Sequence, residues 1–434
     1  MRAKGSLSGP GSERAPWVRL SILFLTVFVD LVGFGIILPL LPFYADRFGA
    51  SGTQIGVLVL SYSAAQFLLA PVWGRLSDRF GRRPILIVGL LGSAVSYLVF
   101  AYAGSITALL LSRIMAGVGG ANIPVAQAYI ADITPPEKRA GGMGLIGAAF
   151  GLGFIFGPAI GGILAPIAPE APGLAAAALC FTNAILALFF LPESLSPEER
   201  AGRVDPAISF RDRPSRFQEA RAIFQNPEFV KILGVSFLFT AAFSAIHPVF
   251  PLFAAERFGL DERGVGWLFA FMGTVSALMQ GGVVRVLVPR VGEAGLVRLA
   301  SIPFVLGLGG VGLAPSIPWL LVALFLLSVG FGGTLPSLVS LLSRSSSAAF
   351  QGGSLGVGQS VSALARIGGP LMGGAAWDLF GGPGPFLTGA LVALAAALWG
   401  LSLPSRRGGG GESAGGREPL EPVGPAGPPL SSPS

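Results

Sequence analysis

Long apolar stretches alternate with short polar segments along almost the whole chain. About 20 apolar residues suffice to cross a bilayer as a helix, so each such stretch predicts one membrane span. The pattern therefore predicts an all-α membrane protein with 12 transmembrane helices. The predicted spans lie at 20–43, 54–74, 84–103, 106–131, 141–166, 172–191, 230–254, 264–284, 296–314, 318–342, 353–377 and 384–403.

The composition agrees with this pattern. Hydrophobic residues make up 52% of the chain and charged residues 12%, against about 25% charged residues in soluble domains. The 64 glycines and 35 prolines suit membrane helices, in which small residues let backbones approach. One cysteine, Cys180, excludes an internal disulfide, and one histidine, His247, argues against a conventional zinc site. We expect no metal and no cofactor.

The charge distribution predicts the orientation. If the N-terminus is cytoplasmic, 24 of the 29 Lys and Arg residues fall on the cytoplasmic side, and the outer loops hold only Arg47, Arg257 and Arg263. The positive-inside rule then predicts that both termini are cytoplasmic. Because the net charge of +7 is explained by orientation, we infer no nucleic-acid partner.

An internal repeat divides the chain into two halves. "GPAIGG" from Gly157 matches "GPLMGG" from Gly369, 212 residues later, and "FYADRFG" matches "LFAAERFG". Six spans per half give two six-helix bundles with pseudo-two-fold symmetry and a site between them. The predicted segments are a cytoplasmic tail 1–19, bundles 20–192 and 230–403, a cytoplasmic linker 193–229, and a disordered cytoplasmic tail 404–434.

Asp30 is the one charge in an apolar run from Leu20 to Tyr44. A carboxylate at mid-membrane costs at least roughly 2.5–3.5 kcal/mol, so it favours a functional role. Proton-coupled transport needs a group that is neutral at one moment and charged at another, and burial favours the neutral form of a carboxyl. We expect Asp30 to carry the proton and to bind a cationic drug in its place. The alternative is a hydrogen-bonded, helix-stabilising aspartate.

Arg113, His247 and Arg366 lie well inside predicted spans. Arg113 could switch the proton on Asp30 by moving relative to it, or could form a structural pair with a carbonyl or with Asp30. His247 titrates near neutral pH and is either a proton relay or a hydrogen-bonded cavity residue. Arg366 contacts either an anionic substrate or backbone carbonyls.

Neutral polar and aromatic residues within the spans predict an amphipathic substrate cavity. Singly, each polar one could also be a hydrogen bond between helices. The cavity candidates are Phe34, Gln66, Asn122, Gln127, Gln280, Gln359 and Arg366, with Tyr62 and Phe271 beside them.

Several motifs resemble those of the major facilitator superfamily. "GRLSDRFGRR", from Gly74 to Arg83, resembles its signature loop, and "LSRIMAGVGGA" and "GFIFGPAIGG" resemble its span-4 and span-5 motifs. "DLVGFGIILPLLP" and "AYIADITPPEKRA" are similar to the tetracycline-efflux branch of the twelve-span drug:proton antiporters. The resemblance covers about 20–403 and implies two bundles that rock around a central cavity. Ser96 stands where tetracycline exporters carry an acid in span 3, so we expect a different substrate.

The resemblance also implies a conformational latch in the signature loop. Asp78 would approach the start of span 11, at 352–355, where the helix dipole favours a carboxylate, and Arg82 or Arg83 would pair with Asp132. The alternative is a simple positive anchor. Pro289 replaces the aspartate in the second half, so the latch would be single. The latch residues are Gly74, Asp78, Arg79, Gly81, Arg82, Arg83 and Asp132.

Glycines recur at every fourth position in "GFIFGPAIGG". They serve either close packing of the two symmetry-related helices, which we favour because the pattern recurs in the second half, or a hinge that seals the cavity against proton leak. The residues of this motif are Gly153, Gly157, Pro158, Gly161 and Gly162.

The sequence thus predicts a secondary transporter that exports hydrophobic or cationic drug-like compounds in exchange for protons. Alternatives are a transporter of a sugar or organic acid and a non-transporting membrane receptor. One His, one Cys and one mid-membrane acid argue against an enzyme, and no Walker loop supports ATP drive. We expect a monomer in a bacterial cytoplasmic membrane, with the lipid bilayer, protons and a small-molecule substrate as partners.

Overall fold

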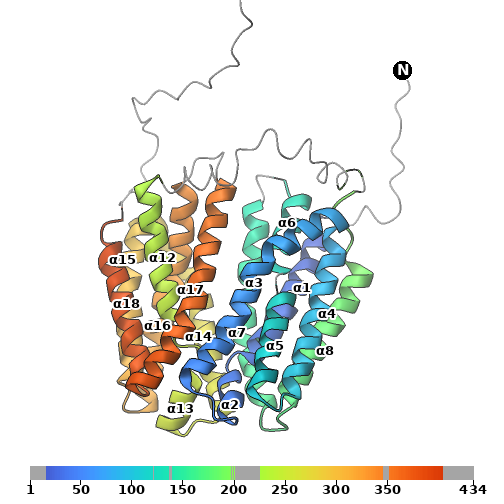
Figure 1. Cartoon of the computed structure of the whole chain (residues 1–434). Coiled ribbons are helices and arrows are strands. Elements are labelled where there is room, and N and C mark those ends of the chain that lie inside the picture. Colours follow the sequence, from blue (N-terminus) through green and yellow to red (C-terminus); the bar gives the residue numbers. More distant parts are fainter. Residues whose placement is uncertain are drawn as a thin grey trace, which may run out of the picture.

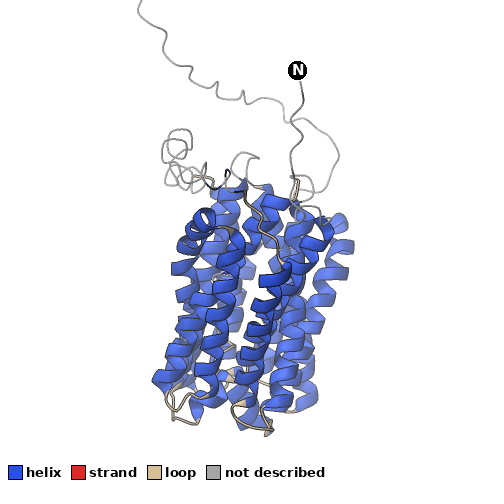
Figure 2. Cartoon of the chain, turned by 90° about the vertical axis from the view of Figure 1, so that its right-hand side faces the viewer, coloured by secondary structure: helices blue, strands red, loops and turns tan. Residues whose placement is uncertain are grey.

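The protein is a bundle of long helices (Figure 1). The computed structural model describes residues 16–120, 122–135, 139–196, 198, 200, 225–345 and 351–403. No strand occurs within these ranges (Figure 2), and the predicted all-α class is confirmed. The predicted terminal tails, apart from the first residues of the first helix, and most of the predicted linker lie outside the described residues.

The first half contains six passes, of which the first and fourth are each divided into two helices. The helices are α1 (Pro16–Ile37), α2 (Leu41–Asp46), α3 (Gly52–Phe80), α4 (Arg82–Ala101), α5 (Ile106–Gly119), α6 (Asn122–Ile133), α7 (Arg139–Leu164) and α8 (Ala171–Phe190).

The second half repeats this order and adds a π-helical turn, η2. Its elements are α12 (Pro227–Ser244), α13 (Phe250–Phe258), α14 (Glu262–Leu278), η2 (Met279–Val283), α15 (Val284–Gly312), α16 (Ile317–Arg344), α17 (Gln351–Phe380) and α18 (Gly384–Gly400).

The described helices are consistent with twelve spans. Nine of them are long and apolar enough to cross a membrane. One of the nine, Glu262–Gly312, has 51 residues, too many for one pass, and is interrupted at Gly292, where φ is 71°. Counting it as two and adding α17, with 30 residues, and α18, with 17 residues, gives the predicted number.

Short polar caps start the helices and keep the connections tight. The Ser51 hydroxyl accepts a hydrogen bond from the Gln54 backbone amide, and the Gln54 side-chain oxygen accepts one from the Ser51 backbone amide, which forms a capping box for α3. Asp261 caps α14 at the corresponding place in the second half. Such caps satisfy amide groups that the first turn of a helix leaves free.

Each half has its own apolar core. In the second half Phe250, Phe304 and Phe386 are fully buried in one cluster, whereas the first half buries two clusters, around Tyr97 and around Tyr129. Many large apolar side chains outside these cores are exposed, as expected for helices that face lipid.

Two ends of the bundle need names. We call tail side the end at which α1 begins and α8 ends, and loop side the end that carries α2 and α13. In Figure 1 the tail side is at the top and the loop side at the bottom. The charge distribution predicts that the tail side is cytoplasmic.

The two halves pack tightly on the loop side. A Cβ atom at Gly52 of α3 would lie 2.7 Å from the Gly374 carbonyl oxygen of α17, and one at Gly56 would lie 2.4 Å from that of Pro370. The same holds for the other pair of helices, since a Cβ at Gly266 of α14 would lie 2.5 Å from the Pro158 carbonyl oxygen of α7. Only glycine permits such contact between backbones.

The same helix faces separate toward the tail side. Gly74 follows Gly56 by eighteen residues, or about five helical turns, and a Cβ there would meet nothing within 4 Å. Gly144 precedes Gly162 by the same interval on α7 and also faces open space, whereas Gly162 touches α14. The halves are therefore closed on the loop side and apart on the tail side.

The glycine motif of α7 packs against α1 of its own half. Cβ atoms at Gly153, Gly157 and Gly161 would lie 2.5–2.8 Å from atoms of Leu31, Gly35 and Ile36. The second half repeats this contact, with Gly373 of α17 against Ala245, which directly follows α12. The motif thus serves close packing in this conformation, with Gly153, Gly157 and Gly161 against α1 of the same half and with Pro158 and Gly162 against α14 of the other half.

We expect Gly157→Ala to destabilise the protein relative to Gly147→Ala. Both changes gain the same helix propensity, but only the first places a methyl group 2.6 Å from Gly35 Cα, whereas Gly147 faces open space. The difference should be about 1–3 kcal/mol, read as a lower melting temperature of the purified protein in detergent. Equal melting temperatures would contradict the close contact of α1 with α7.

Candidate functional site

Asp30 lies on α1, five residues before Gly35, and is half-buried. Its carboxylate accepts hydrogen bonds from Ser93 of α4 and from Cys180 of α8, whose Sγ is 3.9 Å from Oδ1. All three helices belong to the first half. Among the described residues no cation forms an ion pair with Asp30, so its charge has no full compensation.

Arg113 of α5 is 2% exposed, and its Nε and Nη2 atoms have no hydrogen-bond partner. Its guanidinium lies over the rings of Tyr97 and Phe100, with centroid distances of 5.9 and 5.4 Å. The pair with Asp30 that the sequence allowed is not formed, because Asp30 is held by Ser93 and Cys180 instead.

Tyr62 of α3 connects these groups. Its phenol lies within electrostatic reach of Asp30, Arg113 and Arg366, so charges from both halves converge on it. Its ring contacts Phe34 of α1, with the ring centroids 4.7 Å apart.

Gln66 of α3 belongs to the same group of residues. Its amide donates to the Gly120 carbonyl oxygen at 2.8 Å, and its Nε2 lies 3.5 Å from the Tyr62 hydroxyl. The structure therefore brings the predicted residues Phe34 and Gln66 close to Tyr62, with Asp30 within electrostatic reach of the phenol.

The other predicted cavity residues are dispersed. Asn122 is buried between α6 and α4, where its amide nitrogen lies 3.4 Å from the Leu86 carbonyl oxygen, so it is a contact between helices of one half. Gln127 is half-buried, and Gln280 and Gln359 are exposed. A sequence pattern does not give the rotation of a helix about its axis, which decides these positions.

His247 lies apart from Asp30, in the turn at 245–249 that joins α12 to α13. Its Nδ1 atom is 3.3 Å from the Ser244 carbonyl oxygen. Its ring packs edge-on against Phe243 at 5.1 Å between centroids and lies 6.4 Å from the Phe269 ring. This aromatic surrounding within the second half matches the cavity-residue alternative.

Charged contacts reinforce the closed loop side. The Asp378 carboxylate, at the end of α17, accepts hydrogen bonds from the backbone amides of Gly52 and Thr53 at 2.7 and 2.8 Å. It thus caps the first turn of α3 across the two halves, where the helix dipole favours negative charge. Arg47 forms an ion pair with Glu262 at 3.0 Å, again between halves.

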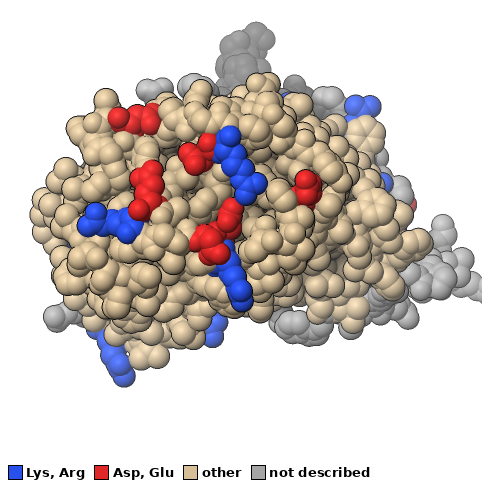
Figure 3. All heavy atoms as spheres, turned by 90° about the horizontal axis from the view of Figure 1, so that it is seen from below, with Lys and Arg blue, Asp and Glu red and all other residues tan. Residues whose placement is uncertain are grey.

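Figure 3 shows the loop side, where small groups of acidic and basic side chains interrupt an otherwise uncharged surface. The sequence analysis missed Asp378. The available signal was its place at the end of a predicted span. Its partners, the backbone amides of Gly52 and Thr53 at the start of α3, are 326 and 325 residues away in sequence.

The sequence profile of the Major Facilitator Superfamily matches residues 23–370. The chain belongs to the Major Facilitator Superfamily.

Relatives of this superfamily member include resistance and transport proteins. The class C tetracycline resistance protein of Escherichia coli is 33% identical over 396 residues, 90% of this chain and 96% of that protein. Multidrug resistance protein 2 of Bacillus subtilis (strain 168) is 31% identical over 360 residues, 82% and 88% of the two chains. The crystal structure of the human organic anion transporter MFSD10 (TETRAN) matches at a TM-score of 0.67 and 27% identity, covering 89% of this chain and 100% of that one. The chain is thus a multi-pass membrane transporter and not an enzyme.

The superfamily signature loop forms an ion-pair network on the tail side. Arg82 pairs with Asp132 at 3.1 Å and with Asp78 at 2.6 Å, while Glu193 accepts hydrogen bonds from the Arg82 and Arg83 amides. Arg82, rather than Arg83, is therefore the partner of Asp132. Gly81 makes the turn with φ 103°.

The remaining parts of the predicted latch are only partly described. The side chains of residues 351–355, near which Asp78 was expected, lie outside the described ones. Arg79 lies over the Phe80 ring at 5.3 Å. Because Gly74 faces open space, the latch contact between the halves is not made at this glycine in the present conformation.

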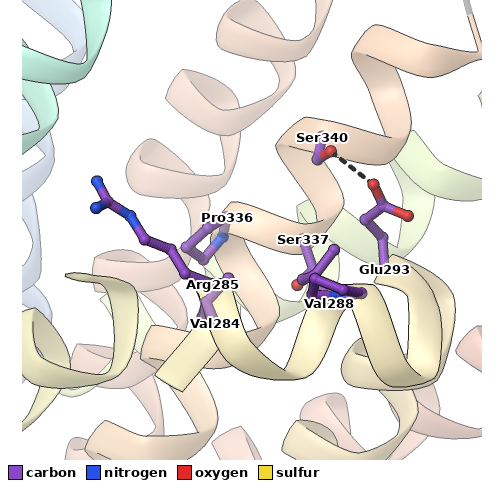
Figure 4. Close-up of a pocket in the computed structure, with 8 residues that line it drawn as sticks. Val284, Arg285, Val288, Glu293, Pro336, Ser337 and Ser340 are labelled. Atoms are coloured by element: carbon purple, nitrogen blue, oxygen red, sulfur yellow. Dashed lines mark hydrogen bonds between the residues drawn. The ribbon is translucent and has the colours of Figure 1, made fainter. Parts of the chain in front are cut away.

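The second half carries the same network with its charges reversed. Glu293 follows Gly292 as Arg82 follows Gly81, and it pairs with Arg344 at 2.5 Å and accepts a hydrogen bond from Ser340 at 3.2 Å. Figure 4 shows this hydrogen bond beside a cavity of about 310 Å³ between α15 and α16. The replacement of Asp78 by Pro289 therefore leaves the intra-half ion pair intact, which the sequence analysis missed.

We expect Asp378→Asn to loosen the loop side of this transporter, since it removes the charge from the α3 cap. Spin labels at Ala50 and Leu379 should report a larger population of long distances. Asp46→Asn, on the same side and without a partner among the described residues, is the matched control. Identical distance distributions in both variants would remove Asp378 from the closure.

The contact of the Asp378 carboxylate with the α3 amides should not change with pH in the physiological range. Burial alone would raise the pKa of Asp378, but hydrogen bonds from Thr53 and Gly52 outweigh it and hold the pKa below its usual range. A carboxylate whose pKa is depressed by folding stabilises the folded state fully at every pH above its usual pKa of about 3.9. This stabilisation is lost only as the pH falls toward and through the lower pKa of the folded state. The distance distribution between the two spin labels in the otherwise wild-type protein should therefore show no opening through loss of the Asp378 charge between pH 8 and pH 5.

Proposed function

We propose that this transporter exports hydrophobic, drug-like compounds from the cytoplasm in exchange for protons. The observation that carries the proposal is Asp30, an ionisable side chain inside an apolar span that has no ion-pair partner among the described residues. A carboxylate there is costly unless it is protonated or bound by a cation. It can therefore hold either a proton or a cationic part of a substrate.

We take the tail side to be cytoplasmic. The positive-inside rule supports this orientation, and acidic residues outnumber basic ones in the loops of the opposite side. Those loop-side acids are Asp46, Glu170, Glu256, Asp261, Glu262 and Asp378. In this orientation the conformation described above is open toward the cytoplasm and closed toward the outside, ready to accept substrate from within.

In the proposed cycle the substrate displaces the proton from Asp30, and the two halves then rock to expose the site on the other side. Outside, a proton returns to Asp30 as the substrate leaves. Competition between the two ligands for one carboxylate is what couples their movements. Arg113 then sets the local field at Asp30, and His247 is a cavity residue of the second half.

Carboxylates at opposite ends of the α3–α17 pair would stabilise the two conformations. Asp378 of α17 caps the start of α3 in the present one. Asp78, at the end of α3, would approach the start of α17 after rocking, where the helix dipole favours it in the same way. In the present conformation Asp78 pairs with Arg82.

The test is transport in inverted membrane vesicles with an imposed pH gradient, using ethidium, rhodamine 6G and norfloxacin. We expect Asp30→Asn to abolish gradient-driven accumulation of every compound that the wild type moves. Asp46→Asn, which also removes one carboxylate, should leave accumulation near the wild-type rate. Membrane abundance of both variants is measured alongside.

Two results would overturn the proposal. One is wild-type accumulation that continues at full rate after the pH gradient and the voltage are collapsed. The other is full gradient-driven accumulation by Asp30→Asn.

A further inference from the structure

Two arginines from opposite halves lie in the membrane region without an acidic partner. Arg113 belongs to α5 and Arg366 to α17. Among the residues that the structure describes, neither guanidinium has a hydrogen-bond or ion-pair partner. Arginines at such depth face a cavity or a partner almost without exception.

Arg113 is the more deeply buried of the two. It is 2% exposed, its Nε and Nη2 atoms have no hydrogen-bond partner, and its guanidinium lies over the rings of Tyr97 and Phe100. Ring faces attract a cation, but they supply no acceptor for its N–H groups. Buried guanidinium donors without acceptors carry a large desolvation penalty, which a bound anion would remove.

Arg366 lies between a tight contact of the two halves and the open tail side. A tight contact of α3 with α17 joins Gly56 to Pro370. From there Tyr62 is six residues, about 9 Å, toward the tail side along α3, and Arg366 is four residues, about 6 Å, toward the tail side along α17. Tyr62 accordingly lies within electrostatic reach of Arg366 and of Arg113.

The charges around Tyr62 do not balance. One acid, Asp30, and two arginines, Arg113 and Arg366, act electrostatically on the Tyr62 phenol. Asp30 accepts its own hydrogen bonds from the neutral side chains of Ser93 and Cys180. The group is therefore net positive even when Asp30 is ionised. A purely cationic substrate would be repelled by the arginines.

A purely anionic substrate would not fit proton exchange either. Protonation of Asp30 makes the group more positive, so an anion and a proton would strengthen each other's binding, as linkage requires. They would then travel together rather than exchange. Exchange requires a positive group of the substrate that competes with the proton for Asp30.

We propose that the central site recognises zwitterionic aromatic compounds, with an anionic group bound between Arg113 and Arg366 and a cationic group at Asp30. This rests on the proposed proton exchange. Guanidinium groups bind carboxylates through charge-assisted, often bidentate hydrogen bonds. The rings of Phe34 and Tyr62, tilted against each other with centroids 4.7 Å apart, and the ring of Phe154, with its centroid 6.1 Å from that of Phe34, supply aromatic surface between the charged groups.

Three dyes with the same tricyclic core test the inference by equilibrium binding to the purified full-length protein. Rhodamine B carries a carboxylate and a cationic ring system, its ethyl ester is only cationic, and fluorescein is only anionic. Fluorescence anisotropy measures each affinity without any proton gradient. We expect rhodamine B to bind at least about tenfold more tightly than its ester, from one charge-assisted contact.

The variants separate the two charges. Arg366→Gln should bring rhodamine B to the affinity of the ester, and Arg366→Lys should retain part of the preference. Asp30→Asn should remove the preference for rhodamine B over fluorescein but keep that over the ester. Arg285→Gln, an arginine in the cavity of Figure 4, is the control and should change none of these ratios.

Equal wild-type affinities for rhodamine B and its ester, or a preference that survives Arg366→Gln, would overturn the zwitterion site. A preference for fluorescein over both rhodamines would do the same and indicate an anion carrier. Because no gradient enters the measurement, these outcomes are independent of the vesicle assay. Proton exchange could fail there while the zwitterion preference holds, or the reverse.

Discussion

An ionisable group in the hydrocarbon layer is costly unless something neutralises it, and this chain has three within electrostatic reach of one tyrosine. Asp30, Arg113 and Arg366 all act on Tyr62, yet among the described residues none forms an ion pair with another. Charges that could compensate each other are held apart by Ser93, Cys180 and the rings over Arg113. The missing compensation is what a proton and a substrate can supply, and the proposed exchange follows from it.

The rest of the fold keeps this group reachable from one side at a time. On the loop side the halves meet through backbone contacts that only glycine permits, and Asp378 adds a charged cap across them. On the tail side the same helix faces diverge. Since each half is tied internally by its own ion pair, Arg82–Asp132 or Glu293–Arg344, the halves can move as units while their contacts with each other change.

The amino-acid pattern predicted the architecture well because hydropathy, positive charge and the repeat all constrain it. It also predicted that Arg82 or Arg83 pairs with Asp132, and the structure shows Arg82 as the partner. It did not predict that Asn122 is buried between α6 and α4, since hydropathy does not give the rotation of a helix about its axis. Nor did it show Asp378 or the charge-reversed pair, because their partners lie far away in sequence or require the exact depth of each helix.

The most direct test of the account is proton release on substrate binding. Rhodamine B is added to the purified transporter in weakly buffered detergent solution with a pH-sensitive dye, and the protons released per bound molecule are counted. If the substrate takes the place of the proton on Asp30, the wild type should release up to one proton per molecule and Asp30→Asn none. Proton uptake by the wild type, or equal release by both proteins, would contradict a shared carboxylate.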